Sequence, residues 1–152
     1  MTSFTRIVVP TDFSESAHRA FESAVELARE SQAELHICHA VEYVAPMVSP
    51  YEIPVPEDFI QQTREAAQNR LTQVVEEGKS AGLYCEGHLL SDRADPGISI
   101  LAEALHADLI VMGTRGSSRL RHIFVGSIAE RTVRHAPCSV LTIKAQPGNV
   151  RH

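Results

Sequence analysis

Hydrophobic residues along the chain form five short runs, separated by longer stretches in which they recur every three or four positions. The short runs are bounded by prolines, glycines or polar clusters, a pattern that predicts β-strands. They are Arg6–Val9, Ala33–Val41, Leu83–Leu90, Asp108–Met112 and Ser139–Ile143. The stretches between them predict amphipathic helices, so a strand–helix unit is repeated four times and closed by a fifth strand.

The predicted helices carry start signals as well as a hydrophobic face. We place Ser14 as the N-cap of the first helix, and Asp95 and Pro96 as the N-cap and first residue of the third. The second helix begins at about Pro56, after a proline-rich stretch from Pro46 that predicts a long irregular loop. The fourth is the short segment SIAERTVRH. The hydrophobic face of the first helix is Ala17, Ala20, Phe21, Ala24, Val25 and Ala28, and that of the second is Ile60, Ala67, Leu71, Val74 and Val75.

Alternating strands and helices predict an α/β fold: an open parallel sheet of five strands with four helices on both faces. The first and fourth strands lack polar alternation, which is typical of central strands buried on both faces. The chain has 152 residues, which predicts one domain over residues 1–146 and a short, frayed tail over 147–152.

Composition narrows the class of protein. Hydrophobic residues make up 43% and charged residues 22%, and the net charge is -5, which argues against bulk binding to nucleic acid or anionic membranes. No apolar run approaches the roughly 20 residues that span a bilayer, and the N-terminus lacks a signal-peptide pattern. We therefore expect a cytoplasmic protein whose three cysteines are reduced. The eight histidines show no ligand spacing, and His36 and His39 fall on opposite faces of a strand, so we assign no protein metal site.

The segment GTRGSSRLRHIFVGS, Gly113–Ser127, follows the most hydrophobic strand. In doubly wound sheets, ligands bind at the carboxyl ends of strands where the strand order reverses. Glycines let backbone N–H groups approach an anion, and Gly126-Ser127 opens a helix whose N-terminus favours phosphate. Asp12, after the first strand, can accept from ribose hydroxyls or simply cap the first helix. The segment is therefore interpreted as a phosphate cradle, although it matches neither GxxxxGK[ST] nor GxGxxG.

With this segment, the chain resembles the universal stress protein family over nearly its whole length, from RIVVPTDFSESA through ELHICHAVE to ADLIVMGTRGSSRLRHIFVGSIAERTVRHAPCSVLTI. The spacing G-2x-G-9x-G-[ST] is the signature of the ATP-binding branch. The resemblance implies the strand order 3-2-1-4-5 and ATP, with magnesium, as the ligand. The implied nucleotide-binding residues are Pro10, Thr11, Asp12, Val41, Met112, Gly113, Gly116, Gly126 and Ser127. Ser139 departs from the family, which usually has proline there.

Two functions remain open. The first is an ATP-binding regulatory module of a stress response, acting on a regulatory protein partner. The second is a slow ATPase or self-phosphorylating enzyme, for which Ser117 and Ser118 offer hydroxyls but no convincing base lies beside them. The last strand, Ser139–Ile143, is an apolar sheet edge, and the resemblance implies a homodimer through it.

Overall fold

The computed structural model describes residues 3–41, 56–91, 94–114 and 126–144. These form the strands β1 (Arg6–Pro10), β2 (Glu34–Ala40), β3 (Cys85–Leu90), β4 (Leu109–Gly113) and β5 (Ser139–Ile143), and the helices α1 (Glu15–Ser31), α2 (Glu57–Ser80), α3 (Ala94–Ala104) and α4 (Ser127–His135). The strands pair in parallel in the order β3-β2-β1-β4-β5. The predicted α/β fold and the implied strand order are both confirmed.

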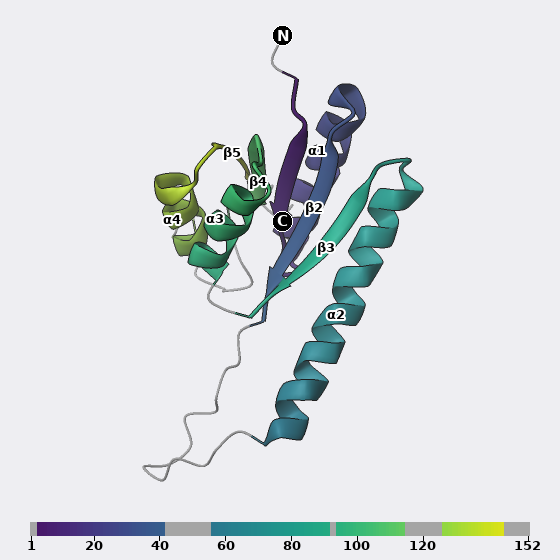
Figure 1. Ribbon diagram of the computed structural model, residues 1–152, viewed down its shortest axis with the longest axis vertical. Coiled ribbons are helices and arrows are strands. Elements are labelled where there is room, and N and C mark those ends of the chain that lie inside the picture. The colour runs from purple at the N-terminus through teal and green to yellow at the C-terminus, as the bar shows by residue number, and fades with distance from the viewer. Residues whose placement is uncertain (1–2, 42–55, 92–93, 115–125, 145–152) are drawn as a thin grey trace, which may run out of the picture.

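Helices cover the sheet on both faces (Figure 1). Because successive strand residues point to opposite faces, Ile7 and Val9 of β1 join one core and Val8 joins the other. The first core is closed by α1 and α2 and also contains Phe21, Ala24, Leu35, Ile37, Leu71, Val75 and Val111. The second is closed by α3 and α4 and also contains Cys38, Ile98, Ala102, Ile110, Met112 and Ala129. Burial on both faces explains why β1 and β4 are almost wholly apolar.

Several element boundaries differ from the predictions by one or two residues, and those of the third helix and third strand have a clear physical reason. The third helix begins at Ala94, so Asp95 and Pro96 lie within its first turn, where a missing proline N–H costs no helical bond. The third strand begins at Cys85 rather than Leu83. The reason is that the Leu83 N–H still donates to the carbonyl of Gly78 at 3.4 Å and so closes the end of α2. The predicted N-cap Ser14 is confirmed, since its Oγ accepts from the Ala17 N–H at 3.2 Å.

The sheet order places β1 and β4 side by side at its centre, with successive strands continuing outward on either side. Their carboxyl ends therefore meet at one edge, which is the topological switch point. Among the described residues, no helix is both long and apolar enough to cross a membrane. The loop from Pro46, residue Gly116 and the tail 147–152 lie outside the described residues, apart from the end of that loop at Pro56.

Candidate functional site

The carboxyl edge of the sheet brings together the ends of β1, β4 and β2. Val41 follows β2, and its N–H donates to the Leu90 carbonyl at 3.0 Å, so the chain stays attached to β3 there. Val41 and Met112 are each 4% exposed. Both side chains are apolar and buried, whereas Asp12, which follows β1, is exposed. The edge therefore combines an apolar part with a polar part.

The turn from β1 into α1 is held by its own polar side chains. The Thr11 N–H donates to the Cys38 carbonyl at 2.8 Å and extends the pairing of β1 with β2. The Thr11 hydroxyl oxygen accepts from the Phe13 N–H at 3.0 Å, and Asp12 Oδ1 accepts from the Ser14 N–H at 3.0 Å. Side chains that bond backbone two residues onward stabilise such turns. Asp12 thus supports the start of α1, as the alternative interpretation holds, although Ser14 is the N-cap.

Phe13 gives this turn an uncommon backbone conformation. Its φ is 64°, the left-handed region that bulky residues rarely adopt. The centroid of the Phe13 ring lies 4.4 Å from that of the His39 ring. It also lies 4.4 Å from the guanidinium carbon of Arg70 in α2. The His39 ring donates from Nδ1 to the Thr11 carbonyl at 2.7 Å. Sequence reasoning missed these residues because they come from three separate elements and share no motif.

A hollow of about 330 Å³ lies beside this turn, between the start of α1 and α2. Its lining includes Thr11, Phe13, His18 and Arg70. Thr11 also belongs to the predicted site, but most of the lining comes from the two helices rather than from the strand ends. The hollow is therefore a neighbour of the carboxyl edge and not the edge itself.

Thr114 joins β4 to both β5 and α4. It is 3% exposed, and its N–H donates to the Ile143 carbonyl at 3.1 Å. Its carbonyl accepts a hydrogen bond from the N–H of Gly126, which is the N-cap residue of α4. The chain on either side of residues 115–125 is thus held together by one backbone bond. As a result, the first glycine of the motif, Gly113, lies close to its last pair, Gly126-Ser127.

Gly113 has a packing role that the sequence did not indicate. A Cβ at this position would come within 3.0 Å of the backbone carbon and carbonyl oxygen of Ser16 and would overlap its hydroxyl. The absent side chain therefore lets α1 pack closely on β4, and the expected opening for an anion stays a prediction. The close approach positions the start of α1 against the end of β4 at the switch point.

The N-terminus of α4 is the part of this edge whose chemistry suits an anion. The first N–H groups of a helix have no carbonyl partner within it and carry a partial positive charge. Ser127 is the first residue of α4 and is exposed. The predicted residues that the structure places at the carboxyl edge are Pro10, Thr11, Asp12, Val41, Met112, Gly113, Gly126 and Ser127.

Comparison with known proteins shows similarity over nearly the whole chain. The model of the Universal stress protein family covers residues 3–144. A universal stress protein of Methanocaldococcus jannaschii is 33% identical over 141 residues, which are 93% of this chain and 82% of that protein. The structure of universal stress protein UspA from Lactobacillus plantarum has a TM-score of 0.82 and 28% identity, covering 94% of this chain and 99% of that one. A universal stress protein from Archaeoglobus fulgidus, solved in complex with dAMP, has a TM-score of 0.65 and 25% identity, covering 94% and 100%.

Proposed function

This chain belongs to the universal stress protein family, and on that footing we propose that it is a regulatory module that binds ATP at the carboxyl edge between β1 and β4. The observation that carries the proposal is the backbone bond between Thr114 and Gly126. It sets the N-terminus of α4 beside the end of β4, at the switch point where doubly wound sheets bind ligands. The dAMP complex of the Archaeoglobus relative supports an adenine nucleotide as the ligand class.

Each part of the edge suits a different part of ATP. The N–H groups at the start of α4 and the Ser127 hydroxyl would bind phosphate oxygens. Val41 and Met112, both buried and apolar, would lie against the base, and Asp12 would accept from ribose hydroxyls. Magnesium would be held mostly by the phosphates, since it keeps several waters and takes few protein ligands.

A regulatory output needs a surface that can respond to the ligand. Helix α4 offers one, because Ile128 and Val133 are 38% and 55% exposed although both are apolar. The phosphate end of the proposed site is the first turn of this same helix. We therefore place the contact with a regulatory protein partner on α4.

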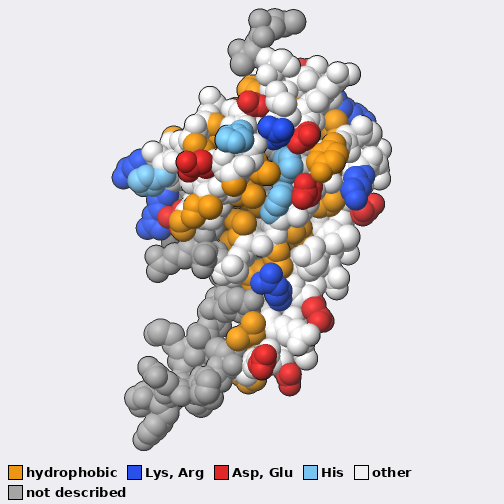
Figure 2. All heavy atoms as spheres, viewed as in Figure 1, with side chains coloured by type: hydrophobic (Ala, Val, Ile, Leu, Met, Phe, Trp, Pro, Cys, Tyr) orange, Lys and Arg blue, Asp and Glu red, His pale blue; other side chains and the backbone are white. Residues whose placement is uncertain are grey.

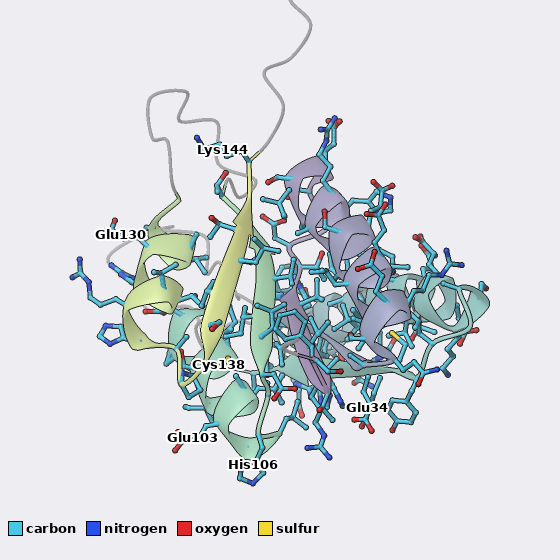
Figure 3. All side chains as sticks on the ribbon, turned by 90° about the horizontal axis from the view of Figure 1, so that it is seen from above. Glu34, Glu103, His106, Glu130, Cys138 and Lys144 are labelled. Atoms are coloured by element: carbon cyan, nitrogen blue, oxygen red, sulfur yellow. The ribbon has the colours of Figure 1, made fainter. Side chains whose placement is uncertain are left out.

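The edge strand β5 is the proposed homodimer interface. Figure 3 shows β5 at the border of the sheet, between Cys138 and Lys144, with α4 beside it. The Ile143 carbonyl bonds to β4 through Thr114. Because backbone groups alternate along a parallel strand, those of Leu141 also face β4, and those of Thr142 face outward. Leu141 is 39% exposed, which suits a strand that pairs with a second copy.

The test is to measure ATP binding with magnesium by calorimetry on wild type and on Ser127→Ala. We expect the variant to bind about ten to a hundred times more weakly, because a hydrogen bond to a charged group contributes about 1.5–3 kcal/mol. The matched control is Ser80→Ala, since Ser80 is an exposed serine at the last position of α2. It should bind like wild type.

Mass spectrometry of the nucleotide released from denatured protein provides an independent measurement of the ligand. Recovery of an adenine nucleotide would support the proposed class. Equal affinities of wild type and Ser127→Ala would show that the phosphates do not bind at the start of α4. No measurable affinity of wild type for ATP would refute ATP as the ligand.

A further inference from the structure

Three side chains of metal-binding type meet on the part of the sheet formed by β2 and β3. His36 Nδ1 lies 3.0 Å from His88 Nε2 and 3.9 Å from Glu86 Oε2. One ligand atom from each residue falls within 4.8 Å of the other two. Figure 2 shows histidine side chains next to acidic ones in the middle of this face of the molecule. His36 is buried, His88 half-buried and Glu86 exposed, so the cluster reaches from the core to solvent.

The pairing of β2 with β3 produces this cluster. His36 is the direct partner of Glu86, and Cys38 is the partner of His88. Residues two apart on a strand share a face, so His36, Glu86 and His88 all point to the side of the sheet that carries α3 and α4. In Figure 1 those two helices lie towards β4 and β5. Helix α3 reaches β2 and the end of β3 at Leu90, and the first residues of β2 and β3 on this face lie beyond it.

Neighbouring side chains fix the orientation of His36 and Glu86. His36 Nε2 donates to Glu34 Oε2 at 3.1 Å, and that carboxylate oxygen also accepts from Arg6 Nε at 3.3 Å. Tyr84 donates from its hydroxyl to Glu86 Oε2 at 3.2 Å. Histidine ligands of metals commonly donate their other ring nitrogen to a carboxylate in this way.

We propose that His36, Glu86 and His88 bind a divalent transition-metal ion of the zinc type, with solvent as the fourth ligand. Two imidazoles and one carboxylate form a ligand set that zinc accepts. Ligands at about 2.0–2.1 Å from a tetrahedral ion lie about 3.3–3.4 Å apart, between the two distances of 3.0 and 3.9 Å measured from His36 Nδ1. The ligand atoms of His88 and Glu86 lie within 4.8 Å of each other, so side-chain movements of at most about 1.5 Å complete the site.

Metal binding requires one proton to move and none to be lost. In the neutral ring that donates from Nε2 to Glu34, Nδ1 of His36 carries a lone pair and can accept a hydrogen bond from His88 Nε2. The ion takes the place of that shared proton, which moves to Nδ1 of His88 and leaves both rings neutral. Spacing along the chain did not indicate this site, because the ligands come from two strands that are far apart in sequence.

The experiment titrates zinc chloride into chelator-treated full-length protein without nucleotide, followed by calorimetry. We expect one zinc ion per chain in wild type, and affinity at least about tenfold weaker in His88→Gln and in Glu86→Gln, since loss of even an outer-sphere partner of a metal ligand costs about 10–100-fold. The matched control is His18→Gln. His18 forms a comparable histidine–carboxylate pair with Glu22, at 3.2 Å on α1, and its loss should leave zinc affinity unchanged.

Cobalt(II) provides a readout of geometry that affinity alone does not. Wild type loaded with cobalt should show the intense visible absorption of a tetrahedral ion, and His88→Gln should not. Urea unfolding followed by circular dichroism verifies that each variant is folded. The proposal is overturned if wild type takes up no zinc, if His88→Gln and Glu86→Gln both bind as tightly as wild type, or if bound cobalt is octahedral. In the first two cases the two histidines form only a hydrogen-bonded pair, and in the third the proposed tetrahedral site is wrong.

Discussion

Replacing Gly113 by alanine should destabilise the protein, because the new methyl group would meet the backbone of α1. The Cβ would lie 3.0 Å from the backbone carbon and oxygen of Ser16, whereas carbon atoms in contact prefer about 3.5–4.0 Å. Backbone atoms cannot rotate away as a side chain can, so α1 must shift from β4 by about half an ångström. Overpacking of this kind costs about 1–3 kcal/mol. Gly113 does not have a positive φ, so the backbone conformation itself adds no penalty.

Urea unfolding followed by circular dichroism measures this loss of stability. The midpoint should fall with the slope unchanged, and the melting temperature should fall by about 2–12 °C for a chain of this size. Gly97→Ala is the matched control, since its Cβ would also lie 3.0 Å from a neighbour, but that neighbour is the end of the flexible Leu90 side chain. Alanine also suits α3 better than glycine. If Gly113→Ala is as stable as wild type within about 0.5 kcal/mol, the close packing of α1 on β4 is not what requires glycine.

Two further predictions concern the sheet edge and the thiols. Thr142→Pro should keep the fold and give a monomer by light scattering, because it removes only a backbone donor that faces away from the sheet. Leu141→Pro should lose about 1–3 kcal/mol of stability, because it breaks a hydrogen bond to β4. A Thr142→Pro variant that stays dimeric would place the interface elsewhere. Thiol labelling of the native protein at pH 8 should leave Cys38 and Cys85 unmodified, because they are 1% and 5% exposed and burial raises their pKa to about 12 and about 11. Cys138, which is partly exposed, should react first, and rapid labelling of all three before unfolding would contradict this burial.

The fold could be predicted from the sequence because each strand and helix has a strong local signal. The apolar runs of β1 and β4 indicate burial on both faces, and the structure confirms it. Boundaries were less certain, since they depend on bonds between elements. Cys85 rather than Leu83 begins β3 because the Leu83 N–H bonds to the end of α2.

The candidate site could be predicted in outline and not in detail. The glycine pattern and the strand order point to the carboxyl edge between β1 and β4, because both depend on local sequence and on the topology of parallel sheets. The packing role of Gly113 could not be foreseen, since it depends on the distance to Ser16 of another element. The cluster of His36 with His88 depends likewise on the register between two strands, which the order of residues along the chain does not contain.

The bond between Gly126 and Thr114 has a consequence for how this protein can vary. It anchors both ends of residues 115–125 to the scaffold through backbone groups, independent of the side chains between them. The entropic cost of joining two fixed ends by a loop rises only slowly with loop length, by about 0.6 kcal/mol for each doubling. Insertions, deletions or an exchanged segment between these two residues therefore leave the sheet and α4 in place. The sequence between these two residues can thus change, by evolution or by design, while the architecture is inherited unchanged.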